Sequence, residues 1–268
     1  MKNNPAPIGV FDSGIGGLTV VRELIRQLPN ESIIYFGDTA RVPYGPKSPD
    51  TVLRYSREIT DYLKGQGIKA MVIACNTATA HALPALRAEN DLPIIGVIEP
   101  GSRAAAKATT GGRVGVIGTY GTINSRAYEK AIEAEAPGTT ITAVACPLFV
   151  PLAEEGWLET DATSLIAKEY LSNFVDSHVD TLVLGCTHYP LLKRVIGQTI
   201  GRDVRLIDSA EETAAETGRV LREAGLAHAE TDDARYRFIA SDAPEQFLRV
   251  GQRFLGSSID RVETVTLG

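Results

Sequence analysis

The sequence is poor in cysteine, in aromatic residues and in long hydrophobic runs. Its 268 residues include three cysteines and one tryptophan, and aromatic residues make up 6%. No stretch approaches the ~18 uninterrupted apolar residues of a membrane span. The N-terminus lacks the apolar core and cleavage site of a signal peptide. Three widely spaced cysteines do not suggest a disulfide framework. We therefore expect a cytoplasmic protein with free thiols and no membrane contact.

Excess positive charge is also absent. The formal net charge is -6, and the basic residues are scattered along the chain. A nucleic-acid partner is not expected, because such proteins carry a clustered basic surface. No CxxC pair and no His/Cys spacing suggests zinc, so no metal site is predicted. What remains is an ordinary globular composition, with 44% hydrophobic and 22% charged residues.

Short β-branched runs alternate with helical patterns along the chain. This alternation predicts an α/β protein with a mostly parallel sheet, which binds ligands beyond the carboxyl ends of its strands. We expect strands at residues 8–11, 32–36, 70–74 and 236–240, helices at 17–28, 50–65, 211–224 and 244–254, and a final apolar run at 261–267. The segment after residue 208 is expected to complete the first domain.

An internal repeat is the more informative feature. Residues 8–14 resemble 114–119, and residues 72–77 resemble 183–188, with a cysteine at the same place in the second pair. A proline-containing helix and an apolar strand ending in an acid are expected after each cysteine, at 94–99 and 204–208. The repeat predicts two similar parallel-sheet α/β domains related by pseudo-twofold symmetry, with the active site in the cleft between them. The domains are 1–98 plus 209–268, and 99–208. The alternative is that any two βα units look alike.

The two repeated cysteines are the candidate reactive groups. Cys75 and Cys186 each end a strand and precede an expected helix start. Unpaired N–H groups and the helix dipole favour a thiolate there. His188 follows Cys186 by two residues and is a plausible proton partner. The alternative for each cysteine alone is a buried structural residue, which is also the role expected of Cys146.

Two equivalent thiols suit inversion at an α-carbon. One group must remove the proton and a second, on the opposite face, must return one. A thiol titrates close enough to neutrality to serve as acid and as base. No cofactor is predicted, so N–H groups and hydroxyls must stabilise the developing carbanion.

Polar residues beside the two cysteines are the candidate substrate contacts. They are Asp12, Ser13, Asn76, Thr77, Thr187 and His188, with Tyr44 and Gly45 in a loop at the strand ends. The alternative role for most of them is helix capping. The Gly-rich turn at residues 14–17 lacks the spacing and the lysine of a phosphate loop.

Five segments resemble the glutamate racemases of the aspartate/glutamate racemase family. They are residues 9–20, 35–45, 74–78, 147–156 and 184–192, and the similarity runs from about residue 8 to about residue 210. The resemblance implies the two-domain fold and interconversion of L- and D-glutamate, which supplies D-glutamate for peptidoglycan. Cys75 and Cys186 match the family's proton donors and acceptors, and the candidate contacts above match its substrate contacts.

The resemblance also implies residues that assist the thiols, an oligomeric state and a preferred substrate. Asp12, His188 and Glu154 match residues that assist the thiols, and a homodimer is expected. Aspartate racemases have Glu where this chain has His188, so glutamate is favoured. The alternatives are aspartate racemase or another racemase of the superfamily, a decarboxylase of the same fold, a cysteine hydrolase using Cys186 and His188, and an amino-acid-binding module. Which cysteine serves which enantiomer stays open, as do dimer geometry, activation and any gyrase side activity.

Overall fold

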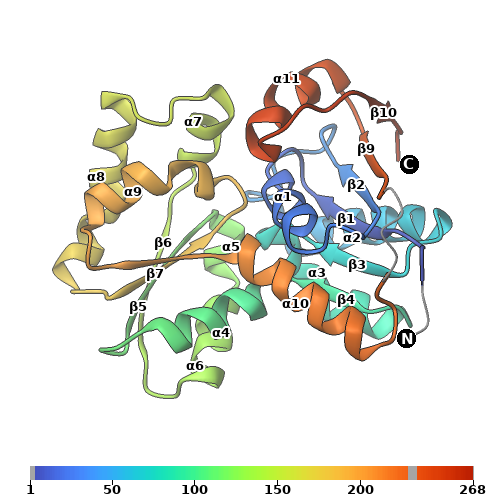
Figure 1. Cartoon of the computed structure of the whole chain (residues 1–268). Coiled ribbons are helices and arrows are strands. Elements are labelled where there is room, and N and C mark those ends of the chain that lie inside the picture. The colour runs from blue at the N-terminus through green and yellow to red at the C-terminus, as the bar shows by residue number, and fades with distance from the viewer. Residues whose placement is uncertain (1–3, 229–233, 268) are drawn as a thin grey trace.

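Two parallel β-sheets form the cores of two α/β domains that lie side by side (Figure 1). The computed structural model describes residues 4–228 and 234–267. The larger domain has a six-stranded sheet in the order β10-β9-β2-β1-β3-β4, and the smaller domain has a four-stranded sheet in the order β6-β5-β7-β8. All the strand pairs in both sheets are parallel.

Helices flank each sheet. The larger domain contains β1 (Ile8–Asp12), α1 (Leu18–Gln27), β2 (Ile33–Gly37), α2 (Pro49–Gly65), β3 (Ala70–Ile73), α3 (Asn76–Glu89), β4 (Ile94–Gly96), α10 (Ser209–Glu223), β9 (Tyr236–Ala240), α11 (Pro244–Leu255) and β10 (Val262–Thr264). The smaller domain contains α4 (Ile98–Ala108), β5 (Arg113–Gly118), α5 (Tyr120–Asn124), α6 (Ala127–Glu135), β6 (Thr140–Ala145), α7 (Phe149–Glu155), α8 (Asp161–Asp176), β7 (Thr181–Gly185), the 3₁₀ helix η1 (Tyr189–Leu192), α9 (Lys193–Ile200) and β8 (Arg205–Asp208).

The internal repeat is visible in the strand order. The run β2-β1-β3-β4 in the larger sheet matches the run β6-β5-β7-β8 in the smaller one. The segment after residue 208 adds β9 and β10 to the free edge beside β2. The predicted fold class is therefore confirmed. The residue boundaries proposed for the domains remain a prediction.

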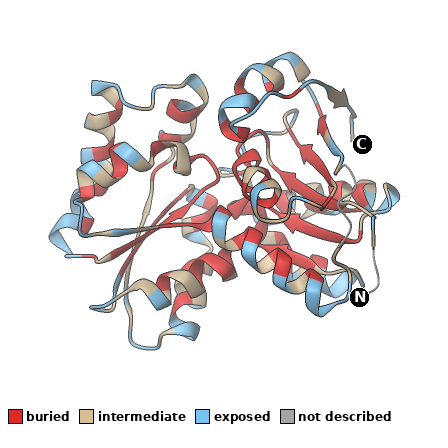
Figure 2. Cartoon of the chain, in the orientation of Figure 1, coloured by how far each residue is buried: buried red, intermediate tan, exposed pale blue. Residues whose placement is uncertain are grey.

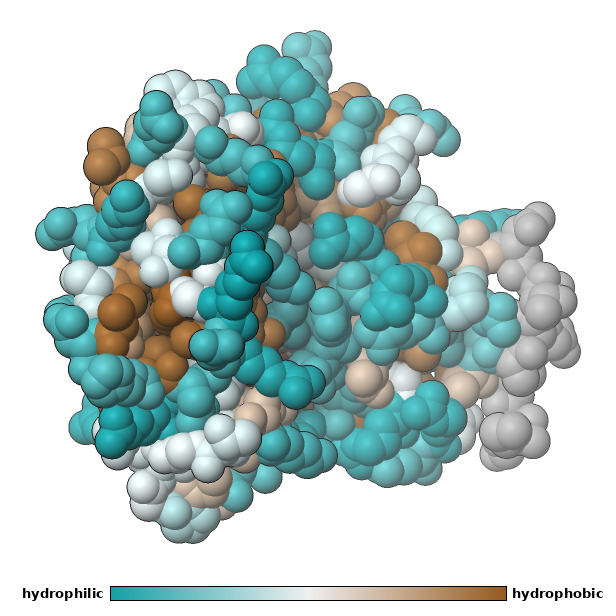
Figure 3. All heavy atoms as spheres, turned by 60° about the vertical axis from the view of Figure 1, so that its left-hand side comes forward, coloured by the Kyte–Doolittle hydropathy of each residue, from teal (hydrophilic) through white to brown (hydrophobic). Residues whose placement is uncertain are grey.

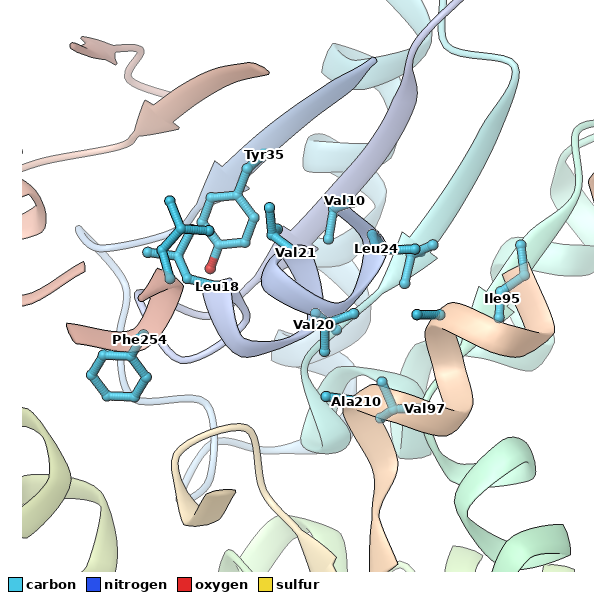
Figure 4. Packing of buried hydrophobic residues seen from close by; sticks show 14 of the residues in the cluster. Val10, Leu18, Val20, Val21, Leu24, Tyr35, Ile95, Val97, Ala210 and Phe254 are labelled. Atoms are coloured by element: carbon cyan, nitrogen blue, oxygen red, sulfur yellow. The ribbon is translucent and has the colours of Figure 1, made fainter. Parts of the chain in front are cut away.

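The inner strands of both sheets are buried on both faces because helices cover them (Figure 2). β1, β2, β3 and β7 are buried along their whole length. Figure 4 shows α1 packing Leu18, Val21 and Leu24 under the larger sheet, with Phe254 of α11 in the same cluster. This apolar packing fixes the strand ends from which the site is built.

One expectation about the segments after the cysteines was wrong. Glu99 does not end a strand, because β4 stops at Gly96 and Glu99 lies in the first turn of α4, paired with Arg87 at 2.7 Å. Pro190 lies in a helix, as expected, and this helix is the 3₁₀ helix η1. Proline lacks the N–H that continues an α-helix, and α9 starts only at Lys193. Pro84 does lie inside α3, as expected.

Within the described ranges, no helix is both long enough and apolar enough to cross a membrane. The surface in Figure 3 is mostly hydrophilic, with separate apolar areas on the face of the smaller domain.

Candidate active site

Cys75 lies at the junction of β3 and α3, where it caps the helix. Its Sγ accepts a hydrogen bond from the Ala78 N–H at 3.4 Å. Burial raises the pKa of Cys75 to about 12, and the charge of Asp12 raises it further, while the Ala78 N–H and the Ser13 side chain lower it. The helix-start N–H favours the thiolate, as expected, but desolvation outweighs this donor, so the net shift favours the thiol of Cys75.

Cys186 follows β7 at the equivalent point of the smaller domain. Only the 3₁₀ helix η1 follows it, so Cys186 does not cap an α-helix as Cys75 does. Its Sγ lies 3.8 Å from Nδ1 of His188 instead. The predicted proximity of Cys186 and His188 is present, but the positive charge near this sulfur comes from a side chain rather than from a helix dipole.

His188 joins Cys186 to Glu154. The Nε2 atom of His188 lies 2.9 Å from Oε1 of Glu154, and the imidazole is buried. Burial disfavours the imidazolium, but the hydrogen bonds and charges of Cys186 and Glu154 outweigh it and raise the pKa of His188 to about 10. An imidazolium at this place stabilises a thiolate on Cys186. The sequence placed Glu154 here only through the family resemblance.

Asp12 lies between the residues around Cys75 and the residues around Cys186. It is fully buried, and its Oδ2 accepts the Gly14 N–H at 3.0 Å. Burial raises the pKa of Asp12, and the His188 charge and the N–H groups of Gly14 and Gly17 lower it. On the other side, the Thr187 hydroxyl approaches Oδ1 of Asp12 at 3.5 Å. The Asp12 carboxylate is therefore coupled to residues beside both cysteines.

The Gly-rich turn after β1 allows the two domains to approach closely. A Cβ atom on Gly16 would lie 2.3 Å from Oγ1 of Thr187 and 2.4 Å from Nδ1 of His188. The Thr19 hydroxyl, one turn into α1, donates to the Thr187 carbonyl at 3.0 Å. Glycine is needed here because any side chain would collide with the loop that carries Cys186.

Asn76 and Thr77 contact residues of the smaller domain that the sequence did not single out. The Tyr128 hydroxyl donates to Oδ1 of Asn76 at 2.7 Å. Nδ2 of Asn76 is buried without a hydrogen-bond partner among the described residues. Oγ1 of Thr77 lies 2.8 Å from Oγ1 of Thr119 and 3.3 Å from Oγ1 of Thr122.

The two threonines and Tyr128 lie on segments without a motif of their own. Thr119 follows β5, the repeat counterpart of β1 and its Asp12-Ser13 pair, so the repeat was the signal that could have identified it.

Tyr44 and Gly45 also lie at the domain boundary. The Tyr44 side chain is buried and its phenol donates to Asp38. The Gly45 carbonyl accepts the Gly121 N–H at 2.8 Å and thereby joins the two domains. A direct substrate contact by Tyr44 stays a prediction.

The assembled site is nearly closed and contains two chemically different sulfurs. Cys75 and Cys186 each keep 6% of their surface exposed, and the charge of Cys186 contributes to the raised pKa of Cys75. A cavity of about 60 Å³ lies beside Glu154, with Gly14 and Phe247 among its walls. Cys146 is fully buried in the apolar cluster of the smaller domain, as expected. All three cysteines are free thiols.

Comparisons with known proteins agree with this geometry. The chain matches the Asp/Glu/Hydantoin racemase family over residues 8–217. A glutamate racemase from Geobacter metallireducens is 56% identical over 97% of this chain and 96% of its own length. A glutamate racemase isoform from Bacillus anthracis superposes with a TM-score of 0.93 at 44% identity, over 97% of each chain. A Francisella tularensis glutamate racemase in complex with D-glutamate superposes with a TM-score of 0.91 at 41% identity, over 98% of each chain. This chain therefore belongs to the Asp/Glu/Hydantoin racemase family, and the relatives that match its whole length are glutamate racemases.

Proposed function

We propose that this protein is a glutamate racemase that works without a cofactor and uses Cys75 and Cys186 as its two acid–base groups. One observation carries the proposal. Two thiols end equivalent strands of two related sheets, and the buried carboxylate of Asp12 is coupled to Cys75 and to Thr187, the residue next to Cys186. The solved relative that holds D-glutamate supports the choice of substrate.

The resting charge states suit a transfer that starts at Cys186. A thiolate on Cys186, stabilised by the His188 imidazolium, takes the α-proton from one face of glutamate. The thiol of Cys75 then delivers its own proton to the opposite face, and the electron pair left on the α-carbon forms the new C–H bond. After turnover Cys186 is the thiol and Cys75 the thiolate, so the reverse reaction starts from that state. Which enantiomer loses its proton to Cys186 stays open.

Donors around the α-carboxylate stabilise the developing carbanion. The free N–H of Asn76 and the hydroxyls of Thr77 and Thr119 form one group of donors at the domain boundary. Such fixed donors contribute most when they are already oriented and shielded from water. Ser13 and Thr187 lie beside the two cysteines and complete the polar lining.

The proposal is tested by incubating the protein with L-glutamate in deuterium oxide without added cofactor. Optical rotation should be lost while deuterium enters the α-position. Cys75→Ser and Cys186→Ser should each abolish racemisation, because serine is too weak an acid to replace either thiol. Unchanged turnover in either variant would contradict the two-thiol mechanism. L-aspartate as the substrate in a parallel reaction separates glutamate racemase from aspartate racemase.

A cysteine hydrolase is the second candidate, and the 3.8 Å approach of Cys186 to His188 is the observation in its favour. It predicts that Cys75 is dispensable and that an acylated Cys186 forms with an activated ester. An amino-acid-binding module predicts saturable glutamate binding without exchange of the α-hydrogen. A decarboxylase predicts release of carbon dioxide and tolerance to the loss of one cysteine.

The proposal extends to a cellular role and an oligomeric state. The protein supplies D-glutamate for peptidoglycan synthesis in the cytoplasm, and it acts as a homodimer. Large apolar side chains on the smaller domain are about half exposed and offer a surface for a second copy: Tyr120, Leu148, Trp157 and Leu165. Light scattering of the purified protein should give the mass of two chains, and a single-chain mass at working concentrations would remove the homodimer from the proposal.

A further inference from the structure

We propose that Arg253 on α11 is a positioning residue for Cys186, acting through Glu154 and His188. The inference rests on the function proposed above, and it gives a role to the C-terminal segment, where the sequence showed no motif. α11 belongs to the larger domain, whereas Glu154 and His188 belong to the smaller one. The two helices involved, α11 and α7, face each other at the top of Figure 1.

At the C-terminus of α7, Arg253 donates a hydrogen bond to the Glu154 carbonyl, which the N–H groups of the helix cap leave free. α7 ends in a left-handed glycine, Gly156 with φ 77°. Within this cap, the Gly156 N–H donates to the Ala153 carbonyl at 3.2 Å and the Trp157 N–H donates to the Leu152 carbonyl at 2.9 Å. Nη1 of Arg253 donates to the Glu154 carbonyl at 2.7 Å and approaches that of Ala153 at 3.4 Å.

Gly156 also leaves room for the guanidinium. A Cβ atom at this position would lie 2.8 Å from Cζ of Arg253. The guanidinium therefore packs against the bare backbone of the cap, and the cation lies at the negative end of the α7 dipole. These contacts fix the main chain of Glu154 from the other domain, and the Glu154 side chain then reaches His188 at 2.9 Å.

The residue next to Arg253 holds the other side of the imidazole. Phe254 is fully buried, and its ring meets that of His188 edge-on, with centroids 5.1 Å apart and an interplanar angle of 77°. Phe254 is anchored in the core of the larger domain with Leu18 (Figure 4). Two consecutive residues of α11 thus restrain His188, one by direct packing and one through Glu154.

Two opposite effects of Arg253 can be told apart. As a positioning residue, it keeps Glu154 on His188, keeps the imidazole protonated and so favours the Cys186 thiolate. As a mere cation, it would disfavour a second positive charge on His188, and its removal would have the reverse effect. The pKa of Cys75 depends mainly on burial, Asp12, Ala78 and Ser13, and least on the charge of Cys186. Cys75 therefore serves as a reference within the same molecule.

The test measures alkylation of each cysteine by iodoacetamide at several pH values, with the modified peptides quantified by mass spectrometry. In the full-length Arg253→Met variant, alkylation of Cys186 at neutral pH should slow about 5-fold relative to that of Cys75, since less of the sulfur is thiolate. kcat should fall about 10-fold and KM should change less, because catalysis slows when His188 and Cys186 are held less firmly in place. Arg253→Lys keeps a hydrogen-bond donor and a positive charge, so it should retain part of the Cys186 alkylation rate and part of kcat.

Arg249→Met is the matched control, because Arg249 is exposed one turn earlier on the same helix. It should leave both alkylation rates and kcat unchanged. Arg253 is itself exposed, so Arg253→Met should fold, and Arg253→Gln gives a second variant whose folding is checked by its melting temperature.

Three results overturn the inference: unchanged Cys186 alkylation, faster Cys186 alkylation, or equal slowing at both cysteines. Racemisation by the wild type is measured in parallel. An active wild type with unchanged Cys186 alkylation in Arg253→Met defeats this inference alone. An inactive wild type whose Arg253→Met variant shows selective slowing at Cys186 defeats the proposed function alone.

Discussion

The Tyr128 hydroxyl donates a 2.7 Å hydrogen bond to Oδ1 of Asn76 across the boundary between the two domains. This bond orients the amide so that its buried Nδ2 has no hydrogen-bond partner among the described residues. In the proposed reaction, these amide N–H groups next to Cys75 donate to the substrate. A residue of the smaller domain thus prepares a donor on the larger one.

Tyr128→Phe should raise KM for glutamate about 5-fold. The lost hydrogen bond orients the Asn76 amide, and loss of a buried hydrogen bond costs about 1 kcal/mol of binding free energy here. The value of kcat should change less than KM. Steady-state kinetics in both directions check this, with Tyr62→Phe on α2 as a control that should leave KM unchanged. If KM in Tyr128→Phe equals that of the wild type, the amide does not depend on Tyr128.

Gly16→Ala should impair both folding and activity. The added methyl group would collide with Thr187 and His188, so the domains must shift apart. Such overpacking costs about 1–3 kcal/mol, and a displacement near the thiols lowers kcat about 100-fold. Urea unfolding and kinetic assays measure the two effects.

Gly65→Ala provides the control for this substitution. Nothing lies within 4 Å of a Cβ atom at Gly65. Because alanine is the better helix former, this variant should gain about 0.5–1 kcal/mol and keep full activity. Equal behaviour of the two variants would show that the close approach at Gly16 is unimportant.

The raised pKa of His188 should make stability depend on pH. The pKa in the folded protein is about 10, above the ordinary value of 6.5. A group of this kind contributes its full stability below the lower value and loses it as the pH rises through the upper one. The wild type should therefore lose more of its melting temperature between pH 6.5 and 10 than His188→Asn does. Parallel profiles for the two proteins would mean that His188 does not carry this charge.

Ser48→Ala should destabilise the protein without affecting the reaction. The Ser48 side chain accepts the Thr51 N–H at the start of α2, far from the cysteines in the chain. Loss of such an N-cap costs about 1 kcal/mol. Chemical denaturation should show this loss while kcat/KM stays at the wild-type value. Ser172→Ala, at an exposed position inside α8, is the control and should change stability by much less.

Sequence patterns identified most of the regular elements because their signals are local. The helix expected at 50–65 starts at Pro49 behind its Ser48 cap, and the strand expected at 236–240 is β9. The error concerned a residue whose side chain favours a helix start rather than a strand end. Glu99 was assigned to a strand end although it stabilises the first turn of α4.

The sequence by itself determined the repeat, the parallel α/β architecture and the pair of cysteines at equivalent strand ends, since all of these are periodic or local properties of the chain. The tertiary structure decided how the two thiols differ. Burial raises the pKa of Cys75, whereas the buried His188, paired with Glu154, supplies positive charge beside Cys186. The tertiary structure also brought Arg253 to the Glu154 carbonyl and Tyr128 to Asn76 across the domain boundary. Desolvation and contacts between distant residues depend on how the two domains pack, and no local pattern encodes that packing.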